Sequence, residues 1–328
     1  MARIFGTGFE RNTLDQFDGS TGTTIVPAEP LNLTGNFACR ISDAYRSYLK
    51  KALGSYPYLY MSLKINIFNI NYNPPIFFYD QNGNIIAKII INDSFNIDLY
   101  RGSTLLATGT SPLSLDTVYQ MEIYYLPLNS GGEFTVKIDG VENVTYSGDT
   151  TPYLENIGSI DFGFKNTYGG GFYFDDLIID DSDWIGIGHS IISAPITGAG
   201  SSAQWTSSTA ATNYANVDEI PYSDTDYNST NTTDALDLYS ISDCFDGIDV
   251  ASIAGIYFNV RTNYEGVPTV SIKPAIKSGV TVGTYATLSQ SVSFSNEQVF
   301  IGVNPGTLAT FTTSDFTNGI EVGVKAVV

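Results

Sequence analysis

The stretch IFFYDQNGNIIAKIII, residues 76–91, indicates the fold class of this chain. Asn82-Gly83 is the residue pair most favoured in a tight hairpin turn, because both residues tolerate the positive φ angles that such a turn requires. The residues on either side are rich in Ile, Phe and Tyr, which fit the pleated surface of a strand. The stretch therefore predicts two antiparallel strands joined by a tight turn.

The same pattern continues on both sides of this hairpin. Segments rich in strand-forming residues alternate with turn residues at a spacing of roughly 8–12 residues, which is typical of a β-sandwich or jelly roll. The segment DAYRSYLKKAL, residues 43–53, fits either a helix or a pair of strands. The other expected strand segments of this half are 58–70, 95–108, 118–126, 133–148, 157–166 and 171–180.

A boundary is expected near residues 180–208, where Gly, Ser and Ala dominate and Pro195 interrupts strand pairing. Strand-like segments resume beyond it, at 252–262, 268–279, 283–294, 298–304 and 319–328. We therefore predict an all-β chain with two β-sandwich (jelly-roll) domains in tandem, residues 1–184 and 185–328. The terminal segment GIEVGVKAVV is expected either inside the second sandwich or paired with a neighbouring chain, because an exposed apolar edge strand promotes aggregation.

The charge balance excludes several classes of partner. Lys and Arg number 15 and Asp and Glu 34, so the net charge is −19, which disfavours binding to phosphates or to an anionic membrane surface. Nine acidic residues fall within 217–249 without a Lys or Arg, and we expect them to face solvent. We expect neither a secretory leader nor a membrane span, because residues 1–12 contain no apolar h-region and no apolar run approaches about 20 residues. Cys39 and Cys244 are expected to be free thiols in a protein made in a reducing cytosol.

Four aspartates occur in GGGFYFDDLIIDD, residues 169–181. Strand alternation places Phe172, Phe174 and Ile178 on one face. A retaining glycosidase needs two carboxylates about 5 Å apart, and the Glu-x-Asp-x-(x)-Glu spacing that supplies them on a sandwich strand is missing. The single histidine, His189, lies in the Gly-rich boundary, which argues against histidine-dependent triads and multi-histidine zinc sites. These observations predict that the chain is not an enzyme.

A structural cation is the other interpretation of these carboxylates. Ca²⁺ binds several carboxylate and carbonyl oxygens, and in many jelly-roll carbohydrate-binding modules acidic residues of the first and last strands share one ion. Glu10 follows the expected first strand, and Asp175 and Asp176 lie in the last. These three residues are the predicted Ca²⁺ ligands, and no other cofactor is expected. The alternative is a polar outer face followed by a turn.

Two regions of the first half resemble the late part of a concanavalin A-like (laminin G-type) sandwich. They are YQMEIYYLPLNSGGEFTVKIDGVENVTYSG, residues 119–148, and IGSIDFGFKNTYGGGFYFDDLIIDDSD, residues 157–183. That family closes on a strand with two aspartates between apolar residues, which makes Asp175 and Asp176 part of the last strand of the first domain. The metal motifs of legume lectins are missing, so the resemblance does not imply sugar binding.

Residues 185–243 and 251–262 are similar to a region of tailed-bacteriophage virion proteins. The resemblance implies a non-enzymatic structural component of a virion, first a capsid-surface (decoration or minor head) protein and second a tail-associated one. It also implies major capsid or tail proteins of the same virion as partners, and a homo-oligomer, with a trimer preferred. The alternative function is a carbohydrate-binding adhesion module that contacts host or mucosal glycans. The matching residues are Gly186, Trp205, Val217, Asp218, Glu219 and Tyr227.

Overall fold

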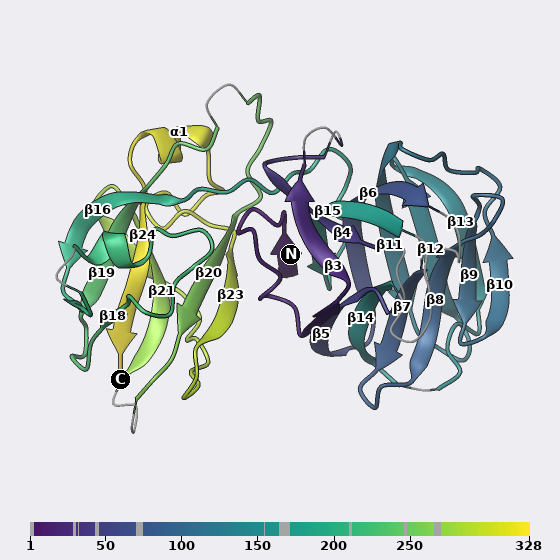
Figure 1. The fold of residues 1–328 in the computed structure, drawn as a ribbon, viewed down its shortest axis with the longest axis horizontal. Coiled ribbons are helices and arrows are strands. Elements are labelled where there is room, and N and C mark those ends of the chain that lie inside the picture. The colour runs from purple at the N-terminus through teal and green to yellow at the C-terminus, as the bar shows by residue number, and fades with distance from the viewer. Residues whose placement is uncertain are drawn as a thin grey trace. The chain divides into compact units, whose positions relative to one another are not determined.

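The computed structural model describes residues 3–28, 31, 33–42, 46–69, 75–153, 155–163, 171–209, 212–245, 248–265 and 270–328. The chain divides into two compact units, Met1–Ile192 and Ser193–Val328, which Figure 1 colours from purple to teal and from green to yellow. The expected boundary was residue 184. Residues 185–192 belong instead with the first unit, for reasons given with the site below.

The first unit contains an eight-stranded antiparallel sheet (Figure 1). Its strand order is β13-β12-β11-β6-β15-β4-β3, and β1 pairs with β15 as well. The strands are β1 (Arg3–Thr7), β3 (Thr23–Pro27), β4 (Phe37–Ile41), β6 (Leu59–Asn69), β11 (Val118–Leu126), β12 (Gly132–Ile138), β13 (Val141–Gly148) and β15 (Gly171–Asp180).

A seven-stranded antiparallel sheet completes the first unit, in the order β10-β9-β8-β7-β14-β5-β2. The hairpin expected at 76–91 is its β7–β8 pair, and Gly83 in the turn has a φ of +85°. Within the ambiguous segment 43–53, the described residues from Tyr48 on form a strand. The strands are β2 (Gly19–Thr21), β5 (Tyr48–Tyr56), β7 (Pro75–Asp80), β8 (Ile85–Ile91), β9 (Ile97–Arg101), β10 (Thr104–Thr108) and β14 (Ile157–Gly163).

One apolar core joins the two sheets of the first unit. Phe78 of β7 packs against Tyr125 of β11 with ring centroids 5.1 Å apart. Phe162 of β14 stacks on Phe174 of β15 at 4.8 Å. Such aromatic contacts, made from both inner faces, are the expected core of a β-sandwich.

The second unit is built on a five-stranded antiparallel sheet of order β16-β19-β24-β21-β22. Two two-stranded sheets, β17-β18 and β20-β23, accompany it. The elements are β16 (Ile196–Ala203), β17 (Thr206–Ser207), the 3-10 turn η1 (Asn213–Asn216), β18 (Asn228–Ser229), β19 (Leu236–Ile241), β20 (Ile256–Thr262), β21 (Ser271–Ser278), β22 (Thr281–Thr284), β23 (Ser295–Ile301), α1 (Thr313–Thr317) and β24 (Glu321–Val327).

The terminal strand β24 lies inside this sheet, between β19 and β21. Of the two arrangements expected for GIEVGVKAVV, the internal one is therefore correct. Val322 of β24 joins Ile276, Ile301, Phe311 and Phe316 in a second apolar core. Helix is limited, among the described residues, to α1 and η1. The prediction of an all-β fold with sandwich or jelly-roll architecture is confirmed.

The sequence led us to expect that the acidic residues of 217–249 all face solvent. This expectation is wrong for Asp237. Asp237 is completely buried. Its carboxylate accepts hydrogen bonds from the backbone N–H groups of Gln204 (2.6 Å) and Trp205 (2.8 Å), from Asn213 Nδ2 (2.6 Å) and from the Tyr239 hydroxyl (3.1 Å). These four donors compensate the cost of burying the charge. Our expectation counted only nearby Lys and Arg residues and so overlooked neutral donors of this kind.

In the part of the chain that the structure describes, no helix has the length and apolar character needed to cross a membrane.

Candidate functional site

The predicted ligands Asp175 and Asp176 lie at a bulge in β15. The pairing of β15 with β6 shifts register between Asp175 and Ile178, and Asp176 has a φ of +48°. The bulge changes the phase of the strand by one residue. Leu177 and Ile179 therefore join the core in place of Ile178, which corrects the alternation expected from the sequence.

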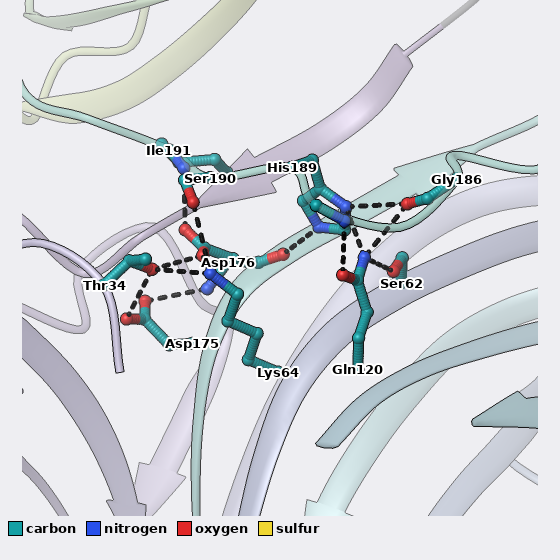
Figure 2. Close-up of polar contacts among 11 residues, drawn as sticks. Thr34, Ser62, Lys64, Gln120, Asp175, Asp176, Gly186, His189, Ser190 and Ile191 are labelled. Atoms are coloured by element: carbon teal, nitrogen blue, oxygen red, sulfur yellow. Dashed lines mark hydrogen bonds and ion pairs between the residues drawn. The ribbon is translucent and has the colours of Figure 1, made fainter. Parts of the chain in front are cut away.

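Asp176 is fully buried, and its carboxylate contacts three different segments (Figure 2). Lys64 Nζ of β6 lies 2.9 Å from Oδ2. The backbone N–H of Ile191 donates to Oδ1 over 2.7 Å, and the Thr34 hydroxyl donates to Oδ2. A charge-assisted network of this kind is the usual way in which a buried carboxylate is tolerated.

Asp175 and Glu10 complete the predicted set. Asp175 is fully buried; its Oδ1 accepts the backbone N–H of Asp176 (2.7 Å) and its Oδ2 accepts the Thr34 hydroxyl (3.3 Å). Glu10 accepts the backbone N–H groups of Asn36 (2.8 Å) and Phe37 (3.1 Å) at the start of β4. The sequence therefore identified three carboxylates that the fold brings into one region.

Burial and mutual repulsion change the protonation of this group. Burial, followed by the charge of Asp176, raises the pKa of Asp175 to about 9, and Glu10 adds to the rise while Lys64 opposes it. Burial also raises the pKa of Glu10, although its hydrogen bonds from Phe37 and Asn36 oppose the rise. Three carboxylates around one ammonium group leave negative charge that a proton or a bound cation can neutralise.

The geometry does not form a metal shell. Among the described residues, no group of three or more His, Cys, Asp or Glu side chains is arranged to hold an ion. The oxygens of Glu10 and Asp176 are already engaged by N–H groups, a hydroxyl and an ammonium. Glu10, Asp175 and Asp176 have the right donor chemistry for Ca²⁺, but side chains would have to rearrange around it, and the Ca²⁺ site stays a prediction.

The segment 186–191 is fastened to the outer face of the eight-stranded sheet, which places the unit boundary after it (Figure 2). Gln120 of β11 holds the segment through both ends of its amide: Nε2 donates to the Gly186 carbonyl (3.0 Å), and Oε1 accepts the Gly188 N–H (2.8 Å). Gln120 Nε2 also lies 2.6 Å from His189 Nδ1, and His189 Nε2 lies 3.1 Å from the Asp176 carbonyl. We call residues 186–191 with Gln120 the linker clamp.

The linker clamp gives the only histidine a positioning role. The Asp176 carbonyl can only accept a hydrogen bond, so Nε2 is the donor in that contact, while Nδ1 lies 2.6 Å from Gln120 Nε2 and 3.1 Å from the Gly186 carbonyl. Gln120, Lys64 and Thr34 were not singled out by the sequence. The sequence offered one indication for two of them: Lys64 and Gln120 are polar residues inside strand segments, on the face opposite the core.

Trp184 packs on the same sheet as the linker clamp. Its ring centroid lies 5.4 Å from that of Tyr60 and 6.1 Å from that of Tyr124, and Lys137 Nζ lies 3.5 Å from the centre of the Trp184 ring. This tryptophan therefore covers strands β6, β11 and β12 of its own unit.

The seven-stranded sheet carries a second group of candidate site residues. Backbone pairing places Tyr100 beside Lys88, Lys88 beside Phe77, Phe77 beside Asp161, and Asp161 beside Lys50. We call these five residues the cross-strand row. It lies on the face opposite the core, because the neighbours of its members along the strands are core residues: Leu99, Ala87, Ile89, Ile76, Phe78, Ile160, Phe162 and Leu49.

The cross-strand row combines aromatic rings with charges that burial perturbs. Lys88 Nζ lies 4.5 Å from the centre of the Tyr100 ring, within cation–π range. Burial lowers the pKa of Lys88. Tyr79, which packs beside Phe77 at 6.2 Å, hydrogen-bonds Asp161, and burial together with the Asp161 charge raises its pKa. Lysine and tyrosine groups perturbed in this way, on one sheet face, are frequent in binding and catalytic sites.

Comparison with known proteins yields similarity of fold only. No protein-family model and no curated protein matches the chain. Among solved structures, the cellulose induced protein Cip1 has a TM-score of 0.44 and 16% identity over 56% of this chain and 100% of its own. An endo-β-1,4-glucuronan lyase from the fungus Trichoderma reesei has a TM-score of 0.42 and 12% identity over 55% and 96%. The binding domain of Paraclostridial Mosquitocidal Protein 1 has a TM-score of 0.40 and 15% identity over 55% and 49%.

The prediction that the chain is not an enzyme is overturned by these comparisons. Polysaccharide lyases, which include the glucuronan lyase and alginate lyases, are among the solved structures that the chain matches. The prediction relied on the missing glycosidase carboxylate pair and on the single histidine. A lyase breaks its substrate by elimination and does not need that carboxylate pair, so these two absences do not exclude catalysis on a β-sandwich.

Proposed function

We propose that the first unit binds a glycan on the outer face of its seven-stranded sheet. The observation that carries the proposal is the cross-strand row, in which Tyr100, Lys88, Phe77, Asp161 and Lys50 follow one another across five strands. Tyr100, Lys88 and Lys50 are partly exposed and can contact a chain that crosses the strands, whereas Phe77 and Asp161 are buried and support the row from below.

The chemistry of the row suits a polysaccharide. The C–H faces of sugar rings pack on aromatic rings such as Tyr100, and sugar hydroxyls can accept hydrogen bonds from ammonium groups such as those of Lys88 and Lys50. Lys88 and Lys50 supply two cations on a chain of net charge −19, so this face can also accept a carboxylated sugar. The half-buried positions of Lys88 and Tyr100 keep their side chains in a small number of conformations, which lowers the entropic cost of binding.

Calorimetric titration of the full chain with neutral and uronate-containing oligosaccharides tests the proposal. We expect Tyr100→Ala and Lys88→Met each to weaken binding by about tenfold, which corresponds to about 1.4 kcal/mol. Tyr58→Ala is the matched control, because Tyr58 is a half-buried tyrosine that packs against Tyr60 and Tyr124 of the other sheet. Equal losses in Tyr100→Ala and Tyr58→Ala, or the lack of any binding oligosaccharide, would contradict the proposal.

The same samples report on cleavage. Elimination from a polyuronate leaves an unsaturated sugar end that absorbs ultraviolet light, so the absorbance of the full chain incubated with polyuronates follows the reaction. An increase that Lys88→Met removes would make the cross-strand row an active site, whereas binding without an increase would make it a recognition surface only.

We further propose, on the similarity of residues 185–243 and 251–262 to phage virion proteins, that the protein works on a virion surface, on the capsid or else on the tail. A glycan-binding unit would then face the host or its surroundings, and the partners would be major capsid or tail proteins. Mass spectrometry of purified particles tests this location, and absence of the protein from them would refute it. Light scattering tests the trimer, which a strict monomer at high concentration would exclude.

A further inference from the structure

A hollow of about 520 Å³ opens at one end of the first sandwich, at a place distinct from the cross-strand row. Three loops form it: the β9–β10 turn with Arg101 and Thr104, the β11–β12 loop with Asn129, and the β13–β14 loop with Asp149 and Tyr153. Its volume lies within the range of about 300–1,000 Å³ that is common for small-ligand sites.

The charges in this hollow cancel. Arg101 and Asp149 form an ion pair across it, with side chains 28% and 42% exposed. The remaining polar side chains of its lining are neutral hydroxyls and an amide, including Thr104 and Asn129. A site with one cation, one anion and several neutral hydrogen-bonding groups favours an uncharged, hydroxyl-rich ligand over an anion, which Asp149 would repel.

Apolar surface lies beside these polar groups. Tyr153 is 50% exposed and Ile85 is 39% exposed, and both line the hollow. An exposed aromatic ring that most monomeric proteins would bury is a natural platform for the C–H face of a sugar ring. The volume of the hollow suits one or two pyranose rings, and its polar groups and aromatic ring suit their chemistry.

The loop that carries Asp149 and Tyr153 is held in place by its own hydrogen bonds. Thr150 is fully buried, and its hydroxyl donates to the Leu126 carbonyl (2.7 Å) and accepts the Leu128 N–H (3.0 Å). The Thr151 hydroxyl donates to the Tyr153 carbonyl (2.6 Å). Because these bonds order the loop before any ligand arrives, binding costs little further conformational entropy.

We infer that this hollow binds a neutral pyranose, either free or as one unit of a glycan. Tyr153 is the stacking residue, and Arg101, Asp149, Thr104 and Asn129 are the hydrogen-bonding residues. The inference does not require the glycan site proposed for the cross-strand row, because the two sites share no residue.

Ligand-observed NMR on the full chain tests this inference, with glucose, galactose, mannose and their methyl glycosides as probes and glucuronate as the anionic counterpart. We expect saturation transfer to at least one neutral sugar, and weakening of about tenfold in Tyr153→Ala and in Asp149→Leu. Leu105→Ala is the control, because Leu105 is also 50% exposed but does not line the hollow. Thermal melts establish that each variant is folded; Tyr153→Ala is expected to melt like the parent since its ring is exposed.

The outcomes separate the two proposals. If Tyr153→Ala weakens the binding of a neutral sugar and Tyr100→Ala does not, the hollow is the site. If Tyr100→Ala alone weakens it, the sugar binds at the cross-strand row, and the inference about the hollow is wrong while the proposed function stands. No transfer to any neutral sugar, or equal transfer to glucuronate, also overturns the inference. Comparison of free sugars with methyl glycosides shows whether the hollow needs a free reducing end.

Discussion

Lys64 and Asp176 form an ion pair of 2.9 Å between β6 and β15, where the Asp176 side chain is fully buried and that of Lys64 is 16% exposed. The pair lies beside Asp175 and Glu10, so removal of the ammonium group leaves the buried Asp176 carboxylate without its cation. We expect Lys64→Met to lower the free energy of unfolding by about 3–5 kcal/mol, the usual cost of breaking a buried pair from one side.

Urea unfolding of the full chain measures this change. Lys325→Met is the matched control, because Lys325 pairs with Asp234 at 2.8 Å on the surface, with side chains 31% and 73% exposed. A surface pair of this kind contributes at most about 1 kcal/mol. Equal effects of the two substitutions would contradict the importance assigned to the buried pair.

Because the pKa of Asp175 is raised, we expect the free energy of unfolding to depend on pH. Its pKa is raised from an ordinary value of 3.8 to about 9, so the folded state binds the proton more tightly than the unfolded state does. The stabilisation from this proton is fully present below about pH 4 and is lost as the pH rises towards 9. We expect the parent to lose stability over this interval relative to Asp175→Asn, whose amide does not titrate. Unfolding free energies measured from pH 5 to 9 test this, and parallel profiles would refute it.

Calcium is expected to compete with that proton. If Glu10, Asp175 and Asp176 rearrange around Ca²⁺, the ion binds the folded state only and raises the melting temperature by mass action. The effect should grow with pH up to about 9, because Asp175 must lose its proton to act as a ligand. Melting curves with Ca²⁺ and with chelator, for the parent and for Asp175→Asn, measure it. A melting temperature that does not respond to either would exclude the site.

The positions of tight turns and the alternation of side chains along each strand could be predicted from the sequence, because both depend on neighbouring residues in the chain. The β7–β8 hairpin at Asn82-Gly83 was predicted for this reason. Glu10, Asp175 and Asp176 were identified because acidic residues of the first and last strands share an ion in many jelly-roll modules, and the structure pairs β1 with β15.

The parts that could not be predicted depend on register and on contacts distant in sequence. The bulge at Asp176 became visible only once β15 was paired with β6, and it moved Leu177 into the core in place of Ile178. Asp237 is buried because donors from residues 204–213 reach it, and a run of acidic residues gives no indication of such donors. The cross-strand row requires the order of five strands, which alternation within each strand does not determine.

Removal of Gln120 from the linker clamp is expected to change the protection of nearby backbone amides against hydrogen exchange. Gln120 Oε1 accepts the Gly188 N–H, whereas the Ile191 N–H is held by Asp176. In Gln120→Ala we expect exchange of the Gly188 amide to accelerate by about tenfold, since a hydrogen bond contributes about 0.5–1.5 kcal/mol and about 1.4 kcal/mol corresponds to a factor of ten. Exchange at Ile191 should change less, because its acceptor remains.

Hydrogen exchange resolved to single amides measures both positions in one sample. Gln81→Ala is the control, because Gln81 also makes a side-chain hydrogen bond to a backbone carbonyl, that of Gly54 (2.8 Å), but on the exposed surface and away from the clamp. Unchanged protection of Gly188 in Gln120→Ala would show that the Glu122 bond to the Gly186 N–H and the Asp176 bond to the Ile191 N–H hold the segment without Gln120. Faster exchange across the whole first unit would instead show that Gln120 supports the sheet as a whole, since it also donates to Ser62 Oγ of β6.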